Sequence, residues 1–263
     1  MPTLDAAAGA PLMDALTKIT AAAAQAILDR STKTTIRTKT DGSPVTDADE
    51  AAEAVICQGL TRIAPGVPVI SEEQSGREAA AVPVRGSYFL VDPLDGTREF
   101  IAGRDEYTIN IALITDAVPV LGIICAPAHG DYWRGIVGKG ADRILKAANN
   151  KPSPIHTRPR PQGETIIMLS RSHLDPQTRA YVGVIPHARL MQSGSSIKFC
   201  RIAEGNADLY PRLAPTHDWD IAAGHAILQA AGGRVTAPDG AAIGYGKKGL
   251  LIPGFIARGD IKD

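Results

Sequence analysis

Apolar residues recur at helical spacing in three long segments of the chain. The first covers about residues 12–28 and is rich in alanine. The second covers residues 47–63 and follows Thr46, a good N-cap residue, with Asp49 in the first turn, where a negative charge favours the helix dipole. The third covers residues 218–231 and ends at a pair of glycines. The pattern therefore predicts three long helices.

Shorter apolar runs between these segments predict strands. They cover residues 36–39, 67–71, 88–92, 108–115, 118–126, 131–137, 165–169 and 207–212. The three runs between residues 108 and 137 are separated by turn residues, which indicates an antiparallel meander. A further helix is expected from Ser195 or Ser196 to Glu204. The alternation of helices and strands predicts a layered α/β (α+β) fold.

The segment 143–162 is the best candidate for a boundary between two halves. It holds five Lys or Arg, four Pro and no acidic residue. We interpret it as a solvated linker, with a contact surface for anions as the alternative. This interpretation divides the chain into an N-terminal α+β half at residues 1–150 and a C-terminal α/β half at residues 151–263.

Composition excludes several classes of protein. The chain has 263 residues, and 28 Lys and Arg balance 28 Asp and Glu, so the formal net charge is zero. This balance gives no reason to expect a nucleic-acid partner or a polybasic membrane surface. With 44% hydrophobic and 21% charged residues, the chain can bury a sizeable core, which excludes disordered and collagen-like classes.

Cysteine usage and the first thirty residues favour a cytoplasmic location. Cys57, Cys125 and Cys200 form no CxxC pair, which fits a reducing compartment. Asp5 and Asp14 precede the alanine-rich segment at the place where a signal peptide would carry positive charge. No stretch approaches the ~18 consecutive apolar residues of a membrane span. We therefore expect neither a signal peptide nor a membrane span.

The hexapeptide DPLDGT, residues 92–97, is the most informative motif for chemistry. Asp92 and Asp95 stand at the end of a buried strand, and the proline between them prevents the strand from continuing its ladder. In the expected turn both carboxylates can face one point, and the Leu94 carbonyl is free of sheet pairing. Gly96 and Thr97 then present backbone N–H groups at a helix start. Hard oxygen donors beside an anion cradle favour a magnesium and phosphate site; a capped turn is the alternative.

Further acidic residues stand at the ends of other predicted elements. Glu72 and Glu73 follow the strand at 67–71, Asp49 opens one helix and Asp220 opens another. Ligand sites of layered α/β folds lie where such elements end. Carboxylates that converge there repel one another, and bound divalent cations are the usual relief. The added acids therefore favour the metal site over the capped turn.

Two other catalytic arrangements fit the sequence less well. Aspartyl-nucleophile phosphatases carry a DxDGT motif with its acids two residues apart, whereas the acids here are three apart. For Ser/His/Asp catalysis His173 and His217 are present, but no GxSxG motif occurs. Metal-activated water is therefore the favoured nucleophile.

Four motifs resemble the lithium-sensitive, magnesium-dependent phosphomonoesterases related to inositol monophosphatase and fructose-1,6-bisphosphatase. They are KTDGSPVTDAD at residues 39–49, VISEE at 69–73, DPLDGT, and WDIAAGHAILQAAGG at 219–233. Within that superfamily LSRSHLD at 169–175 and GSSIKFCRIAEGNADLYPR at 194–212 resemble the CysQ-type 3'(2'),5'-bisphosphate nucleotidases. The resemblance spans nearly the whole chain and implies the family's layered α-β-α-β-α sandwich.

The resemblance also implies a set of site residues. The implied magnesium ligands are Glu72, Asp92, the Leu94 carbonyl, Asp95 and Asp220. They would hold two or three Mg²⁺ ions, with Mn²⁺ as a substitute and Li⁺ as an inhibitor. Thr97 and Asp49, together with Glu72, would orient and deprotonate the attacking water, so that no phosphoenzyme is needed.

The implied substrate is a small bisphosphorylated nucleotide, adenosine 3',5'-bisphosphate, hydrolysed at its 3'-phosphate to AMP. The implied substrate contacts are Gly96, Thr97, Ser170, His173, Gly194, Ser195, Ser196, Lys198 and Asp220, with Arg171 on the loop of Ser170. Aromatic residues make up only 5% of the chain and predict no base-stacking platform, so the adenosine assignment depends on the resemblance.

Several polar residues allow two interpretations. Lys39 and Lys198 are either surface lysines or cations of the site. Arg201 is more typical of a surface residue, and His225 of a hydrogen-bonded core histidine. The His217-Asp218 pair either perturbs the second metal or caps the helix.

Two alternatives for the activity also stay open. An inositol monophosphatase or fructose-1,6-bisphosphatase of the same superfamily would share the metal residues. A non-catalytic nucleotide or metal sensor would keep the fold, but it would not need the water-activating pair of Thr97 and Asp49. The sequence does not indicate an oligomeric state.

Overall fold

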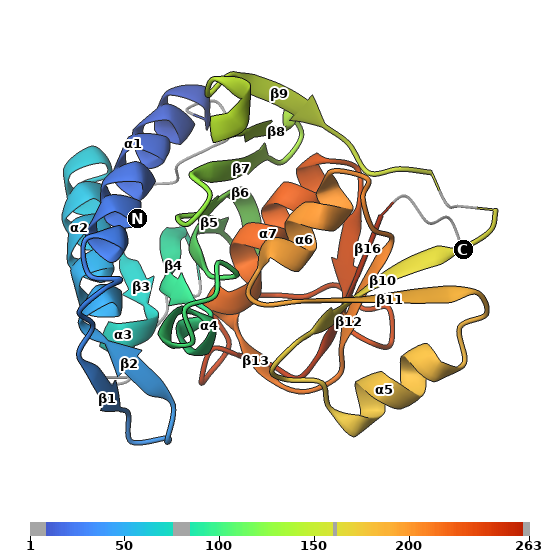
Figure 1. Ribbon diagram of the computed structural model, residues 1–263. Coiled ribbons are helices and arrows are strands. Elements are labelled where there is room, and N and C mark those ends of the chain that lie inside the picture. Colours follow the sequence, from blue (N-terminus) through green and yellow to red (C-terminus); the bar gives the residue numbers. More distant parts are fainter. Residues whose placement is uncertain (1–8, 76–84, 160–161, 260–263) are drawn as a thin grey trace.

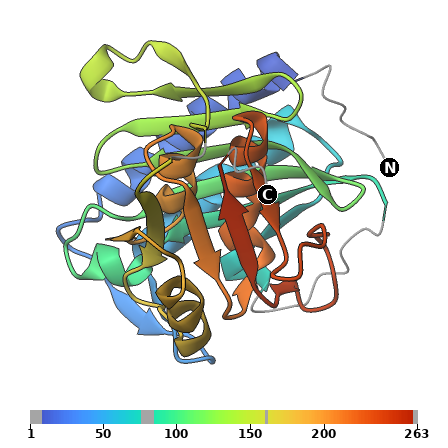
Figure 2. The same ribbon diagram turned by 90° about the vertical axis from the view of Figure 1, so that its right-hand side faces the viewer.

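Five layers build the molecule, as the computed structural model of residues 9–75, 85–159 and 162–259 describes it. Helices α1 (Gly9–Leu28) and α2 (Asp47–Ile63) cover one face of a first sheet, and α6 (Ile197–Ala203) and α7 (Asp218–Ala230) lie between that sheet and a second one (Figure 1). Helix α5 (Pro176–Gly183) covers the outer face of the second sheet (Figure 2). The predicted α-β-α-β-α sandwich is confirmed.

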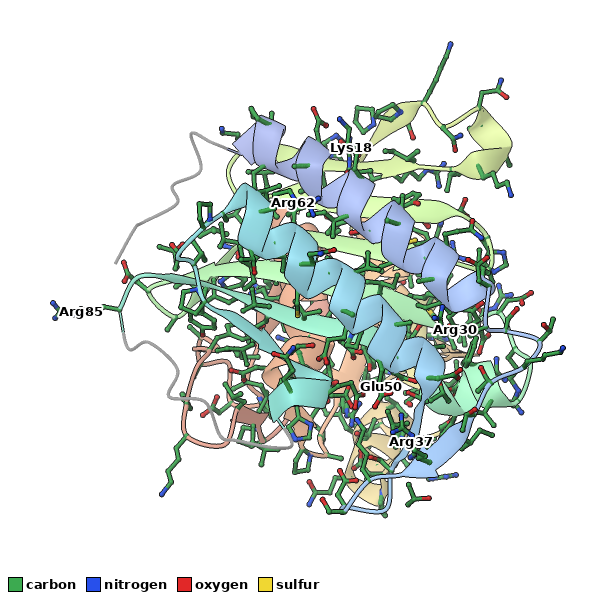
Figure 3. The ribbon with its side chains drawn as sticks, turned by 90° about the vertical axis from the view of Figure 1, so that its left-hand side faces the viewer. Lys18, Arg30, Arg37, Glu50, Arg62 and Arg85 are labelled. Carbon is green, nitrogen blue, oxygen red and sulfur yellow. The ribbon has the colours of Figure 1, made fainter. Side chains whose placement is uncertain are left out.

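The outer helix layer shows the amphipathic pattern that the sequence predicts. Leu16 and Ile27 of α1 are fully buried, whereas Lys18 of α1 and Arg62 of α2 point outward (Figure 3). Thr46 caps α2 and forms a capping box with Asp49, so the helix begins where its cap predicts. Asp5, one of the two acids that weigh against a signal peptide, lies outside the described residues. The described part of the chain contains no helix long and apolar enough to cross a membrane.

The first sheet has seven strands within the described residues, in the order β3-β4-β5-β6-β7-β8-β9. They are β3 (Val69–Ser71), β4 (Ser87–Asp95), β5 (Thr108–Thr115), β6 (Val118–Ala126), β7 (Asp131–Ile136), β8 (Gly140–Ile144) and β9 (Pro152–Ile155). The β3–β4 pair is parallel and every other pair is antiparallel. The meander expected between residues 108 and 137 is confirmed.

The second sheet has five described strands in the order β11-β10-β12-β16-β14. They are β10 (Thr165–Ser170), β11 (Ala188–Ser193), β12 (Leu209–Arg212), β14 (Arg234–Thr236) and β16 (Phe255–Arg258). Strand β10 is parallel to both neighbours, whereas β16 is antiparallel to β12 and β14. Two short ribbons complete the fold: β1 (Ile36–Thr38) with β2 (Pro44–Thr46), and β13 (Thr216–His217) with β15 (Leu251–Ile252). The parallel order brings the ends of β10 and β12 to one edge.

Helix α7 is apolar on nearly all sides because it is wedged between the two sheets. A Cβ atom built on Gly122 of β6 would lie 2.4 Å from the carbonyl oxygen of Ala223 in the helix. On the other side of the helix, a Cβ on Gly224 would lie 2.4 Å from Cγ of Phe199 in α6. Glycine therefore sets the distance at which helix and sheet meet, and this fixes the start of α7 relative to β4 and β5.

Strand β4 does not end at Asp92, as the proline in DPLDGT had led us to expect. It continues to Asp95, with Asp92 opposite Asn110 and Asp95 opposite Thr108 on β5. Three steps on β4 therefore match two steps on β5, which is the register of a bulge. The bulge accommodates Pro93, which has no N–H to donate to the ladder.

The expected linker at 143–162 is wrong over part of its length. Strand β9 lies inside it and extends the first sheet, pairing with β8 from Ala141 opposite Ile155 to Ile144 opposite Pro152. Prolines suit such a strand because it lies at the edge of the sheet. Residues 160 and 161 of the segment lie outside the described residues, and the division of the chain at residue 150 stays a prediction.

Candidate active site

A cavity of about 170 Å³ lies where the two halves of the chain meet. It is lined by all the predicted metal ligands and by all the predicted substrate contacts except Arg171: Glu72, Asp92, Leu94, Asp95, Gly96, Thr97, Ser170, His173, Gly194, Ser195, Ser196, Lys198 and Asp220. Asp49 does not line the cavity and lies behind Thr97, to which it is hydrogen-bonded. The structure therefore brings residues from both halves of the sequence to one cavity.

The four predicted acidic ligands come from three elements. Glu72 opens the short helix α3 (Glu72–Ser75) directly after β3, Asp92 and Asp95 flank the bulge of β4, and Asp220 lies in the first turn of α7. Each carboxylate has one oxygen that accepts a hydrogen bond: from Lys39 to Glu72, Leu94 N to Asp92, Asn110 to Asp95, and Thr216 and His217 N to Asp220. The other oxygen of each accepts none from the described residues.

Burial and mutual repulsion raise the pKa values of three of these acids, Glu72, Asp92 and Asp95. Burial raises the pKa of Glu72 to about 8, against the opposing effect of Lys39, with Glu73 and Asp220 adding to the rise. Burial, followed by repulsion from Glu72 and Asp95, holds the pKa of Asp92 well above its usual value. Burial and Asp220 raise the pKa of Asp95 to about 6. The cavity therefore has an acidic wall that gains by taking up positive charge.

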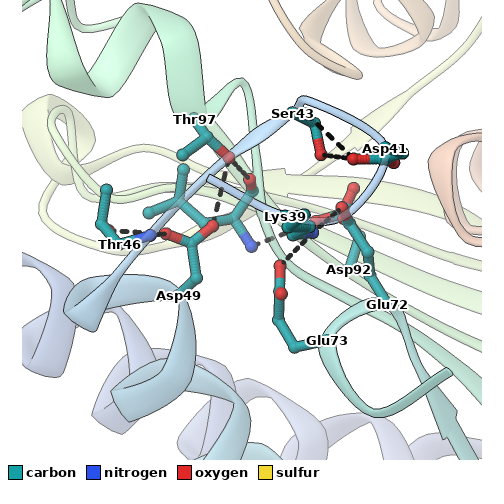
Figure 4. Close-up of polar contacts among 10 residues, drawn as sticks. Lys39, Asp41, Ser43, Thr46, Asp49, Glu72, Glu73, Asp92 and Thr97 are labelled. Atoms are coloured by element: carbon teal, nitrogen blue, oxygen red, sulfur yellow. Dashed lines mark hydrogen bonds and ion pairs between the residues drawn. The ribbon is translucent and has the colours of Figure 1, made fainter. Parts of the chain in front are cut away.

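The acidic wall fits divalent cations in its chemistry, although it is not closed around one point. Among the described residues, no three His, Cys, Asp or Glu side chains already stand together at metal-binding spacing. Lys39 forms an ion pair with one acid of this wall. Its Nζ lies 2.6 Å from Oε1 of Glu72, and it also lies 2.7 Å from Oε1 of Glu73 (Figure 4). Lys39 is thus a site cation rather than a free surface lysine. Four free carboxylate oxygens remain, which is the donor type that magnesium prefers.

Asp49 and Thr97 form a buried pair beside the acidic wall. Asp49 is 1% exposed, and its Oδ2 accepts hydrogen bonds from the backbone N–H of Thr46 at 2.8 Å and from its hydroxyl at 2.6 Å (Figure 4). Thr97 Oγ1 lies 3.1 Å from both Asp49 Oδ1 and the Leu94 carbonyl oxygen. Unlike the four wall carboxylates, Asp49 therefore has both oxygens engaged. Burial raises its pKa.

Gly96 is the N-cap residue of α4 (Thr97–Ile101), in a conformation that favours glycine. Its φ is +96°, and a Cβ atom would lie 3.1 Å from the carbonyl oxygen of Glu106. The backbone N–H groups of Gly96 and Thr97 donate no hydrogen bond within the described chain. The helix start that DPLDGT predicts is confirmed, with two unpaired amides at the cavity.

The opposite wall of the cavity is cationic. Lys198 of α6 is 2% exposed, and its Nζ donates to the carbonyl oxygens of Ser193, at 3.2 Å, and Ser195. Burial lowers the pKa of Lys198 to about 8, against the opposing effect of Asp95. Lys198 is therefore a cation of the site and no surface lysine.

Arg212 is a residue of the cavity that the sequence analysis missed. It ends β12, lines the cavity, and its Nε is buried with no hydrogen-bond partner among the described residues. The available signal was a cation at the end of a predicted strand. Ser195 has a similar unsatisfied group: its Oγ is buried without a partner, and its φ is +44°. Both groups offer unused hydrogen-bond donors at the cavity.

Other predicted residues lie away from the cavity. Arg171 does not line it, because its guanidinium is engaged by Glu106 and by the Gln192 carbonyl. Arg201 lies at the surface, ion-paired with Glu204, as predicted.

His225 in α7 and His217 at the start of this helix contact other side chains and not the cavity. His225 is buried with its Nδ1 2.9 Å from the Tyr245 hydroxyl, so it is the predicted core histidine. His217 stacks on Trp219 with ring centroids 4.6 Å apart, and Asp218 accepts a hydrogen bond from Gly246 N at 2.7 Å. Neither His217 nor Asp218 lines the cavity.

Comparisons with known proteins agree with this arrangement. The chain is 40% identical over 225 residues to the 3'(2'),5'-bisphosphate nucleotidase CysQ of Escherichia coli K12, a match that covers 82% of this chain and 86% of that protein. It is 32% identical over 226 residues to the histidinol-phosphatase of Mycobacterium tuberculosis, covering 84% of each. The crystal structure of CysQ from Bacteroides thetaiotaomicron, a bacterial member of the inositol monophosphatase family, matches 96% of this chain and 98% of that chain with 34% identity and a TM-score of 0.80.

A family model spans all of the described residues. The model of the inositol monophosphatase family matches residues 9–259, which include every residue that lines the cavity. The likeness therefore extends from the outer helices to the last strand of the second sheet, and it includes both walls of the site. The chain belongs to the inositol monophosphatase family.

Proposed function

We propose that this protein is a magnesium-dependent 3'(2'),5'-bisphosphate nucleotidase that hydrolyses the 3'-phosphate of adenosine 3',5'-bisphosphate to AMP and phosphate. The observation that carries the proposal is the cavity itself, in which four acids with free oxygens face the cations Lys198 and Arg212. Relatives of about 40% identity that bear the name of this nucleotidase support the choice of substrate.

The acidic wall is the proposed place for two or three Mg²⁺ ions. The proposed ligands are Glu72, Asp92, the Leu94 carbonyl, Asp95 and Asp220. Bound there, the ions would lower the pKa of an attacking water and neutralise charge on the phosphate and the leaving oxygen. Water attacks phosphorus directly, so no side chain has to form a bond to phosphate.

Thr97 and Asp49 are the proposed path for the proton of the attacking water. Thr97 Oγ1 would take this proton while passing its own to Asp49 Oδ1, 3.1 Å away. The raised pKa of Asp49, a result of burial, makes its carboxylate a better proton acceptor. Thr46 holds the other oxygen of Asp49, so the accepting oxygen is kept toward Thr97. Glu72 would help to orient the same water.

The remaining residues of the cavity are proposed to bind the substrate's phosphates. The unpaired amides of Gly96 and Thr97 can donate to the phosphate that is cleaved. Lys198, Arg212 and the Ser195 hydroxyl can bind the second phosphate, because each offers a donor in the cationic wall. Ser170, His173, Gly194, Ser196 and Asp220 line the same cavity and complete the proposed set of substrate contacts.

A substrate panel tests the proposal. Phosphate release is measured from adenosine 3',5'-bisphosphate, inositol 1-phosphate, fructose 1,6-bisphosphate and histidinol phosphate, each with Mg²⁺ and with a chelator. We expect the highest kcat/KM for the nucleotide and no turnover with chelator. A higher kcat/KM for any of the other three esters would replace the proposed substrate, and nucleotide binding without turnover would indicate a sensor.

A pair of aspartate variants tests the acidic wall. Asp95→Asn is expected to lower kcat about 100-fold or more while the protein stays folded, because the site loses a carboxylate. Asp14→Asn is the matched control, since this acid of α1 is exposed and does not line the cavity. Equal rates for Asp95→Asn and the unmodified protein would remove Asp95 from the reaction.

Three finer expectations accompany the proposal. Mn²⁺ should substitute for Mg²⁺, since both prefer oxygen ligands. Li⁺ should inhibit by displacing one magnesium, which the assay measures as a loss of rate that added Mg²⁺ relieves. The cytoplasmic location expected from the cysteine pattern stays a prediction.

A further inference from the structure

Asn110 of β5 lies behind the acidic wall, does not line the cavity and is 1% exposed. Its amide connects two groups that belong to different halves of the chain. Nδ2 lies 3.4 Å from Oδ2 of Asp95, and Oδ1 lies 2.6 Å from the hydroxyl oxygen of Ser196. Ser196 directly precedes α6, and its hydroxyl lies 2.8 Å from that of Thr108. Hydrogen bonds thus link four polar side chains in series, from Thr108 through Ser196 and Asn110 to Asp95. Ser196 belongs to the segment 194–196 between β11 and α6, which we call the substrate loop.

The carboxylate of Asp95 fixes the direction of every hydrogen bond in this series. A carboxylate only accepts, so the amide must turn its Nδ2 toward Asp95 and its Oδ1 toward Ser196. Oδ1 also only accepts, so Ser196 donates its single hydroxyl proton to Asn110. The Ser196 oxygen must then accept from Thr108. With the amide reversed, two acceptors would face each other at Asp95.

Burial makes this order costly to break. Thr108, Asn110 and Ser196 are all buried, and each polar group left without a partner there would cost about 1–3 kcal/mol. Thr108 and Asn110 are two residues apart on β5, so both side chains project from the same face of the sheet toward α6. The sheet therefore presents a rigid donor to one oxygen of Asp95 and leaves the other oxygen free for the cavity.

We propose that Asn110 is a positioning residue, which holds the Asp95 carboxylate in the orientation that binds a divalent cation and is itself oriented by the hydroxyl of Ser196. This inference depends on the proposed function, because it assigns a partner to one of the proposed metal ligands. The Ser196 hydroxyl thereby gains a second role, since it couples the position of the substrate loop to the acidic wall.

The test is calorimetric titration of Mg²⁺ into protein without substrate. Loss of a hydrogen-bond partner of a metal ligand weakens metal affinity by about 10–100-fold in other proteins. We expect Asn110→Ala to weaken Mg²⁺ binding about tenfold. Ser196→Ala should weaken it by a smaller factor, because the amide remains but is no longer oriented. The double variant should bind Mg²⁺ no more weakly than Asn110→Ala alone, since both substitutions interrupt the same series of hydrogen bonds.

Thr115→Val is the matched control. It removes a hydroxyl from the same strand, where Thr115 Oγ1 lies 2.9 Å from that of Ser87 at the opposite end of the β4–β5 pair. Its Mg²⁺ affinity should equal that of the unmodified protein. Thermal melting without metal is measured for all variants, so that a general loss of stability is distinguished from a loss of metal affinity. If Asn110→Ala does not fold, Ser196→Ala decides the question.

The outcomes separate this inference from the proposed function. If the unmodified protein binds no Mg²⁺, the metal site fails and the positioning role fails with it. If it binds Mg²⁺ and both Asn110→Ala and Ser196→Ala bind equally well, Asn110 has no positioning role and the proposed function stands. If the two substitutions act additively, Ser196 does not act through Asn110.

Discussion

Arg171 and Glu106 hold the two halves of the chain together through a two-point ion pair. Nε of Arg171 lies 2.8 Å from Oε2 of Glu106, and Nη2 lies 2.8 Å from Oε1. The same Oε2 accepts a hydrogen bond from the backbone N–H of Gly194 at 2.9 Å. Glu106 belongs to the loop before β5, whereas Arg171 and Gly194 follow β10 and β11. The substrate loop is therefore anchored to the half that carries three of the four wall acids.

Weakening this anchor should raise KM more than it lowers kcat. In Arg171→Lys the two-point contact becomes a single one, which leaves Gly194 less firmly held. Because the pair is partly exposed, we expect a modest rise in KM of about two- to fivefold with kcat nearly unchanged. Steady-state kinetics with adenosine 3',5'-bisphosphate measure both constants. Arg189→Lys, at an exposed ion pair, is the control; an unchanged KM in Arg171→Lys would show that the anchor does not serve binding.

Stability of the metal-free protein should fall as pH rises from about 4, the ordinary range of carboxyl pKa values, to about 8. The pKa values of Glu72, about 8, and Asp95, about 6, are above their ordinary values, so the folded protein binds these protons more tightly than the unfolded chain. The contribution is therefore present at low pH and is lost as pH passes 6 and then 8. Melting temperatures in chelator measure it, and Mg²⁺ should restore stability most at pH 8. A melting temperature that Asp95→Asn leaves equally pH-dependent would argue against this origin.

His225 should act in the opposite direction at lower pH. Burial lowers the pKa of this core histidine from 6.5 to about 4, so the unfolded chain binds its proton first as pH falls. The stability it contributes is complete above pH 6.5 and is lost toward pH 4, about 3 kcal/mol in all. His225→Gln should therefore lose less stability than the unmodified protein over this range in urea unfolding. His156→Gln, at an exposed position, should match the unmodified protein; identical slopes for His225→Gln would refute the assignment.

Gly122 should tolerate no side chain. The added Cβ of Gly122→Ala would lie 2.4 Å from a backbone oxygen of α7, which cannot rotate away. We expect a loss of about 1–3 kcal/mol in the free energy of unfolding, together with lower activity, because α7 carries Asp220 at its start. Gly183→Ala is the control, since nothing lies within 4 Å of the added atom. Equal stabilities of the two variants would mean that α7 can shift at no cost.

Local patterns predicted the long helices, the meander and the acids of the cavity, because each depends on neighbouring residues. The substrate contacts were implied by the family resemblance instead. Thr46 marks the start of α2 from its cap alone, and DPLDGT places two acids and two amides within six residues. The bulge of β4 was not predictable in this way. It depends on the register with β5, which a rule for proline in a strand does not contain.

Residues that act across long distances in the sequence were missed for a related reason. Arg212 resembles any cation at a strand end until the fold places it opposite Asp95. Asn110 is an ordinary polar residue in an apolar strand until Ser196, 86 positions away, meets its amide. Strand β9 lies in a segment whose prolines and charges are typical of loops and predict a linker, whereas the edge of a sheet accepts the prolines of this strand.

The wedged position of α7 also bears on how the chain is made. Strands β5 and β6 leave the ribosome about a hundred residues before the helix that covers their inner face, which at about 5–20 residues per second means a wait of roughly 5–20 seconds. During that time the apolar face of the nascent sheet that α7 later covers is exposed to solvent. Molecular chaperones that bind apolar surfaces would bind this face. Synonymous codons that slow translation after residue 126 would lengthen the time for which it is exposed.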